Sequence, residues 1–147
     1  MKESVGYTVT LNLVIVFIAI IFTFLSAALI YFKSNKVTNI VVNSLEKYEG
    51  YNSLSEKDIT LNLSSIGYQS KAINCKTTIR SGSETCNIIP GMNGKKGYCI
   101  YECNESSEYY YYRVRINMMM NIPIINNILD IPIYSNTNRL YDFENKK

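Results

Sequence analysis

The four cysteines, Cys75, Cys86, Cys99 and Cys103, are the residues of this chain with the most specific chemistry. Ten residues separate the first two and three separate the last two, and these spacings match no Cys-x-x-Cys pair of a structural zinc site. An even number of cysteines in a small domain favours two disulfides formed in an oxidising compartment. Four unpaired thiols and a metal site are the alternatives. All three pairings of the cysteines stay open.

Most catalytic chemistry is excluded by what the sequence lacks. The 147 residues include no histidine and no tryptophan, which excludes Ser-His and Cys-His nucleophile pairs and the usual catalytic zinc sites. No phosphate loop, dinucleotide fingerprint or calcium-loop pattern is present. The net charge of +3 is too small to indicate a nucleic-acid or acidic partner. We therefore expect a protein that is not an enzyme and that uses no cofactor, no metal and no nucleic acid.

One further cluster could bind a ligand. Tyr109–Tyr112, followed by Arg113 and Arg115, has the composition of a surface on which nucleic-acid bases stack. The same residues are strong strand formers, and we favour a strand whose aromatic side chains pack on a helix. Met118–Met120 is likewise expected to fill a core or a subunit contact.

These residues must be positioned relative to a long apolar segment near the start of the chain. Val9–Phe32 contains no charged residue and would form a helix of roughly 36 Å. Because the hydrocarbon core of a bilayer is about 30 Å thick, the segment predicts a transmembrane helix.

The spacing of small and polar residues gives this helix one distinctive face. Asn12, Ala19, Thr23 and Ser26 share it, and such residues favour close packing between helices in lipid. Alternatively, Thr23 and Ser26 hydrogen-bond carbonyls of their own helix.

The charges that flank the helix nearly balance. Lys2 with Glu3 lies on one side, and Lys33 with Lys36 lies on the other. Because the expected disulfides form in an oxidising compartment, we expect a single-pass cell-membrane protein with residues 1–8 as a cytoplasmic tail and its C-terminal domain outside. A secretory signal cleaved at Ser26-Ala27-Ala28 is the alternative.

Residues 33–50 continue the helix as an amphipathic extension. Apolar residues recur there at helical spacing and form one stripe, namely Val37, Ile40, Val41, Leu45 and Tyr48. We therefore expect one continuous rod from Val9 to Tyr48, ended by Gly50. Two helices with a hinge at Lys33–Lys36 are the alternative.

Residues 51–140 are expected to form a small α+β head. Ser55 and Asp58 resemble a capping box for a second helix that buries Ile59, Leu63 and Ile66 and ends at Gly67. The expected strands are Ala72–Ile79, Tyr98–Cys103, Tyr109–Met120 and Ile131–Tyr134, with a loop over Ser81–Lys96 and a flexible tail over 141–147. In the second strand, Cys99, Tyr101 and Cys103 should point away from Ile100, and Pro132 suits an edge strand.

This organisation resembles that of type IV pilin-like proteins, and more narrowly the TadE-like pseudopilins. The residues that carry the likeness are Glu3–Gly6, the segment Lys33–Gly50 ending in Glu46-Lys47-Tyr48-Glu49-Gly50, and Ile131-Pro132-Ile133 before Thr137. In prepilins a Gly or Ala at the cleavage point precedes a Glu at the fifth position. Here Leu11 holds the fifth place after Gly6.

The resemblance implies a non-catalytic minor pilin or pseudopilin of a pilus or secretion apparatus. Its partners would be the lipid bilayer and other pilin-like subunits, which it would contact through the N-terminal helix. Two alternatives stay open: an accessory subunit of a membrane complex that never enters a filament, and a secreted domain released by signal cleavage.

Overall fold

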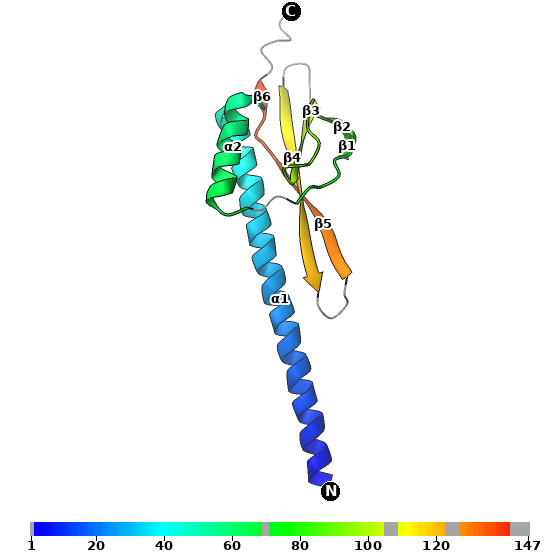
Figure 1. Ribbon diagram of the computed structural model, residues 1–147. Helices are drawn as coiled ribbons and strands as arrows, with labels where there is room; N and C mark the ends of the chain where they lie inside the picture. Colours follow the sequence, from blue (N-terminus) through cyan, green and yellow to red (C-terminus); the bar gives the residue numbers. More distant parts are fainter. Residues whose placement is uncertain (1, 69–70, 105–108, 123–126, 142–147) are drawn as a thin grey trace, which may run out of the picture.

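The computed structural model describes residues 2–68, 71–104, 109–122 and 127–141 (Figure 1). It has an α+β fold in which a helix far longer than the head carries a second helix and an antiparallel sheet at its C-terminal end. The helices are α1 (Lys2–Lys47) and α2 (Ser53–Ser65). The strands are β1 (Thr78–Ser81), β2 (Glu84–Ile88), β3 (Tyr98–Asn104), β4 (Tyr109–Ile122), β5 (Asn127–Asn136) and β6 (Leu140–Tyr141).

The predicted continuous rod is confirmed. Helix α1 runs without a break through Lys33–Lys36, where a hinge was the alternative, because no proline or glycine interrupts the chain between Tyr7 and Lys47. The helix begins at Lys2, so residues 2–8 belong to it structurally. Its C-terminal part packs on the head, and Val37, Val41 and Leu45 are fully buried there.

The end of α1 differs from the prediction. The helix ends at Lys47, and the left-handed position that closes it is occupied by Glu49, with φ 51°, instead of by Gly50. The amide of Gly50 donates to the carbonyl of Leu45 at 2.8 Å, and that of Glu49 donates to the carbonyl of Glu46 at 3.3 Å. This is the usual hydrogen-bonding pattern of a helix C-terminus that ends in a left-handed residue.

Replacing Glu49 by glycine should stabilise the head. A side chain in the left-handed region costs about 1–2 kcal/mol, and a glycine removes most of that cost. We expect E49G to raise the Tm of the head in detergent micelles by several degrees, about 4–8 °C per kcal/mol for a domain of this size. E49A is the matched control and should gain nothing, because alanine keeps the Cβ. Equal Tm values for the two variants would contradict this account.

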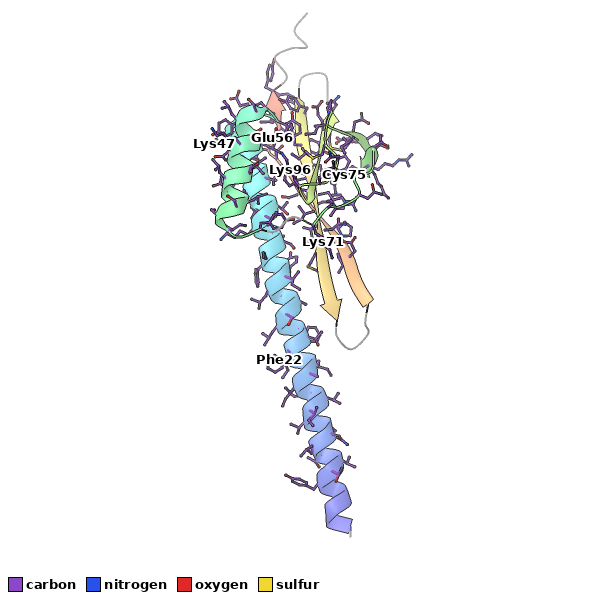
Figure 2. All side chains as sticks on the ribbon, in the orientation of Figure 1. Phe22, Lys47, Glu56, Lys71, Cys75 and Lys96 are labelled. Atoms are coloured by element: carbon purple, nitrogen blue, oxygen red, sulfur yellow. A yellow bond between two sulfur atoms is a disulfide. The ribbon has the colours of Figure 1, made fainter. Side chains whose placement is uncertain are left out.

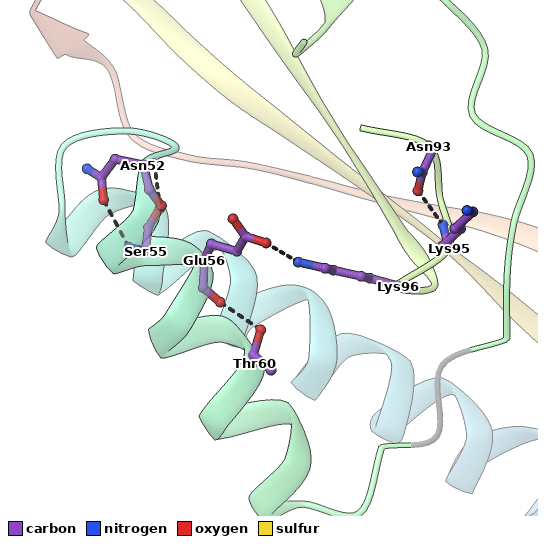
Figure 3. Close-up of polar contacts among 7 residues, drawn as sticks. All are labelled: Asn52, Ser55, Glu56, Thr60, Asn93, Lys95 and Lys96. Atoms are coloured by element: carbon purple, nitrogen blue, oxygen red, sulfur yellow. Dashed lines mark hydrogen bonds and ion pairs between the residues drawn. The ribbon is translucent and has the colours of Figure 1, made fainter. Parts of the chain in front are cut away.

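Helix α2 is where the sequence predicts it, but its cap is not. Asn52 is the N-cap: its side chain accepts from the amides of Leu54 and Ser55, both at 3.0 Å, and the Ser55 hydroxyl accepts from the Asn52 amide at 2.8 Å (Figure 3). The predicted box of Ser55 and Asp58 was therefore three residues late. As expected, Ile59 and Leu63 are buried, Ile66 packs against the same core, and Gly67 follows the helix with φ 64°.

The strands follow the order β1-β2-β3-β4-β5, all antiparallel, and β6 also pairs with β4. The strand predicted at Ala72–Ile79 was wrong for residues 72–77, and β2 lies inside the predicted loop Ser81–Lys96. Only Thr78 and Ile79 of β1 fall within the predicted strand, and β2 was missed because Glu84–Ile88 holds few apolar residues. A two-residue turn at Gly82, with φ 65°, joins them.

The longer strands were easier to predict. Strand β4 covers the predicted Tyr109–Met120, and β5 contains Ile131–Tyr134, with Pro132 on an edge strand as expected. Leu140 and Tyr141 form β6, where a flexible tail was predicted from residue 141; residues 142–147 lie outside the described residues.

Each face of the sheet contributes to a different buried cluster, one with α1 and one around the disulfides. The face toward α1 forms the main core, in which Tyr98, Ile100, Val114 and Ile116 meet the buried stripe of α1. The opposite face carries a second cluster of Ile73, Cys86, Cys99, Tyr101 and Cys103. The predicted alternation in β3 is therefore confirmed.

Candidate functional site

The most unusual surface of the protein is the N-terminal part of α1. Large apolar side chains from Tyr7 to Phe32 stand exposed around the helix, and Phe17 is 61% and Phe24 72% exposed. Among the described residues, α1 is the one helix long and apolar enough to cross a membrane, judged by length and composition. Water-soluble monomers rarely expose a contiguous apolar surface of this extent.

The predicted packing face lies on this exposed part. Asn12 and Ser26 are exposed, whereas Ala19 and Thr23 are half-buried. The Thr23 hydroxyl donates to the Ala19 carbonyl, and the Ser26 hydroxyl to the Phe22 carbonyl, both at 2.8 Å. These hydroxyls are thus satisfied within their own helix, as in the alternative interpretation. Contact of this face with other helices stays a prediction.

The disulfide prediction is confirmed, and the pairing is now defined. Cys75 is bonded to Cys99 and Cys86 to Cys103, and the described chain has no free cysteine. Cys86 lies directly opposite Cys103 on neighbouring strands, so this bond reinforces the β2–β3 pairing. The Cys75–Cys99 bond instead fastens the irregular segment before β1 to the outer face of β3.

The tyrosine cluster is used for packing. Tyr112 is 7% exposed in the core, where burial raises its pKa to about 12. The Tyr110 hydroxyl donates to the Glu49 carbonyl at 3.3 Å, and the Tyr111 hydroxyl donates to Glu84 Oε2 at 2.6 Å. The two arginines are also engaged within the head: Arg113 lies over the Tyr134 ring, and Arg115 donates to the Asn74 carbonyl at 3.2 Å. This arrangement fits the packed strand that we favoured.

Contacts that join the two helices escaped the sequence analysis. The Ser44 hydroxyl donates to Asp58 Oδ2 at 2.6 Å, and Lys47 Nζ lies 3.5 Å from Asp58 Oδ1. The hydrogen bond from Ser44, and then the charge of Lys47, lower the pKa of the Asp58 carboxyl below its usual range. The signal was present in the sequence, because Ser44 and Lys47 fall within one turn of α1 beside the buried stripe.

Because the folded protein favours the charged form of Asp58, its contribution to stability is present above the ordinary aspartate pKa of about 3.9. That contribution is lost as pH falls through the lower folded pKa. We expect S44A to have a lower Tm than the wild type near neutral pH, and the difference to shrink in acid. S65A is the control, since the Ser65 hydroxyl donates only to a carbonyl of its own helix. A Tm deficit that is independent of pH would contradict the assignment.

One small cavity lies between α2 and the start of β3. It has a volume of about 200 Å³ and is lined by Thr60, Leu63, Ser64, Tyr68, Lys96 and Tyr98. An ion pair between Lys96 and Glu56 spans the gap beside it (Figure 3). In the part of the chain that the structure describes, no group of His, Cys, Asp or Glu residues is arranged to hold a metal. The six residues that line the cavity include no Asp, Glu, Cys or His.

The comparisons with known proteins add no further assignment. No family model, curated protein or solved structure matched the chain. The exposed apolar part of α1 and the disulfide-bonded head attached to it are thus the features from which a function must be argued.

Proposed function

We propose that this protein is a non-catalytic, membrane-anchored, pilin-like subunit of a pilus or a related secretion apparatus. The observation that carries the proposal is the continuity of α1 over 46 residues. One half of the helix is exposed and apolar, and the other half is fixed in the core of the head. A rod of this kind transmits any movement of the head directly to the membrane segment.

Membrane anchoring is supported by the free-energy cost of leaving the apolar half of α1 exposed to water. Each buried Val, Leu, Ile or Phe side chain is worth about 1.5–3 kcal/mol relative to exposure in water, and the exposed part of α1 carries many of them. A bilayer removes this surface from water. The two disulfides favour an oxidising compartment for the head, so we place the head on the extracytoplasmic side.

In the pilin-like role, the apolar half of α1 would exchange its contacts with lipid for contacts with neighbouring subunits. In lipid, the apolar half of α1 is covered by acyl chains; in a filament it would be covered by the same half of neighbouring subunits. The energetic cost of extraction is small only if the rods pack closely, and small side chains such as Ala19 permit such close approach. Leu11 stands at the position where pilins have a glutamate. Docking of this subunit into a filament would therefore depend on helix packing and not on the ion pair typical of pilins.

Photo-cross-linking in cells tests this role. A photoreactive amino acid at Asn12 or Ala19 avoids introducing new thiols beside the native disulfides. Matched controls at Val14 and Ile21 lie about half a turn away on the same helix. We expect protein adducts, with a mass above that of one chain, from Asn12 and Ala19, and mainly lipid adducts from the controls.

Lipid adducts alone from all four positions would overturn the packing role while leaving the membrane anchor in place. Protein adducts that never appear in a sheared filament fraction would favour an accessory subunit of a static membrane complex.

A further inference from the structure

The sheet continues beyond the two buried clusters of the head as an extension, in which Met118 is buried. Strand β3 begins at Tyr98, which pairs with Ile116, yet β4 continues six residues further, to Ile122, and stays paired with β5 along the whole length. At about 3.3 Å per residue this two-stranded extension is roughly 20 Å long. We call residues 117–122 and 127–132 the hairpin extension.

The hairpin extension points toward the membrane end of the molecule. In Figure 1 it runs down beside α1, in the direction of the N-terminus, past all other parts of the head. Helix α1 contacts both β4 and β5. On the helix below the head, Ala27 and Ile30 are half-buried, whereas Leu29 and Phe32 are 71% and 68% exposed. The ends of the two strands lie slightly above the labelled Phe22 (Figure 2).

The depth of the strand ends follows from the shared core. Ile116 and Tyr98 lie in the same cluster as Val37 of α1. A distance of roughly 20 Å back along a helix is about 13 residues, which brings the strand ends to the level of about Phe24. Lys33, the first charged residue above the apolar segment, lies roughly 14 Å higher along the helix.

The apolar segment is longer than a bilayer requires, and the excess is close to the distance between Lys33 and the strand ends. No charged residue occurs from Ser4 to Phe32, which corresponds to a helix of roughly 44 Å against a hydrocarbon core of about 30 Å. The excess of roughly 14 Å matches the distance between Lys33 and the strand ends. A span close to Ser4–Phe24 would therefore place the strand ends at the boundary between acyl chains and headgroups.

The composition of the hairpin extension suits that boundary. Between Arg115 and Arg139, Asp130 is the one charged residue in the sequence. Asp130 is exposed and accepts a hydrogen bond from Asn117 at 2.9 Å, and it lies three residues after the start of β5. The hydrocarbon core does not admit open sheet edges, because their backbone groups have no partner there. The headgroup region admits them.

We propose that the hairpin extension is a second membrane contact, inserted into the outer leaflet at the boundary of headgroups and acyl chains, and that it fixes the angle of the head on the bilayer. The proposal rests on the membrane anchoring of α1 that is proposed above. Lipid is the occupant that the geometry favours, because the extension runs alongside the same helix that enters the bilayer, toward its N-terminus (Figure 1).

Single tryptophans measure this depth without background, because the chain has none. The full-length protein is reconstituted in vesicles of phosphatidylcholine and phosphatidylglycerol that carry bromine at defined positions along the acyl chain. L129W and M120W, which are directly opposite in the register, probe the hairpin extension. F17W, roughly 10 Å deeper along α1 than the level of the strand ends, probes the helix, and L61W probes an exposed position of α2.

We expect L129W and M120W to lose most emission with bromine near the top of the acyl chain, F17W with deeper bromine, and L61W with neither. Quenching of F17W without quenching of either hairpin variant would overturn this inference and leave the membrane anchor intact. No quenching of F17W would overturn the anchor itself. The tryptophan emission of the hairpin variants could also be blue-shifted, unquenched by brominated lipid and dependent on protein density. That result would show that the extension contacts a second copy of the chain instead of lipid, and would contradict the proposal.

Discussion

Removing the two disulfides should destabilise the head strongly, and the Cys75–Cys99 bond should contribute at least as much stability as the other. The bonds close loops with sequence separations of 24 and 17 residues, for which the loss of chain entropy in the unfolded state predicts about 3 kcal/mol each. Together they amount to about 6 kcal/mol, a large part of the 5–15 kcal/mol that stabilises a typical domain.

The native contacts indicate which of the two disulfides contributes more stability. Cys86 and Cys103 are already held opposite each other by the pairing of β2 and β3. The segment that contains Cys75 has no strand partner. Apart from the disulfide it is held by the burial of Ile73 and by separate hydrogen bonds, from the Ile73 amide to the Gly94 carbonyl at 3.0 Å, from Arg115 to the Asn74 carbonyl at 3.2 Å and from the Ile88 amide to the Thr77 carbonyl at 2.9 Å. We therefore expect C75S/C99S to be the less stable of the two double variants.

Urea unfolding, followed by the near-ultraviolet signal of the 13 tyrosines, measures both effects. Each pair of serines should lower the free energy of unfolding by about 3 kcal/mol. Treating the wild type with reductant should reproduce the loss seen when both pairs are replaced. A fully reduced head with an unchanged unfolding midpoint would contradict this account of its stability.

Two arginines in the exposed half of α1 abolish membrane retention. Placing Arg at the centre of a membrane helix costs about 2.5–3.5 kcal/mol per residue, so V16R/I20R should lose about 5–7 kcal/mol of insertion free energy. We expect the variant to leave the carbonate-washed membrane fraction almost completely. Neither position contributes to the core of the head, so the head itself should still form its disulfides.

The matched control uses apolar side chains of similar exposure on the head. Leu54 and Leu61 of α2 are 60% and 59% exposed, close to the 58% of Val16. L54R/L61R adds the same charge and should stay in the membrane. Equal retention of the two double variants, or equal loss, would mean that the exposed half of α1 does not hold the protein in the bilayer.

The long elements could be predicted because each carries a pattern repeated over many residues. The stripe through Val37, Val41 and Leu45 and the alternation around Ile100 both identified buried faces correctly. Strand β2 and the second half of β1 could not be predicted, since their positions depend on the bond from Cys86 to Cys103 and on a turn at Gly82. Their own residues carry too little apolar periodicity to be recognised.

Contacts between segments that lie far apart in the sequence were the other feature that could not be predicted. The sequence predicted two disulfides but left all three pairings open, because the pairing depends on which strands are neighbours. The link from Ser44 to Asp58 and the cap at Asn52 depend on how the loop between the helices turns. The extent of the hairpin extension followed only from the register of β4 and β5.

The central claim is that one unbroken helix holds an oxidised head at the membrane. Intact-mass spectrometry of protein from carbonate-washed membranes, alkylated before and after reduction, tests it most directly. The account predicts a chain that retains the residues before Ala28, with no cysteine alkylated before reduction and all 4 alkylated afterwards. A soluble product that begins after Ala28, or a membrane product whose cysteines react without reductant, would contradict it.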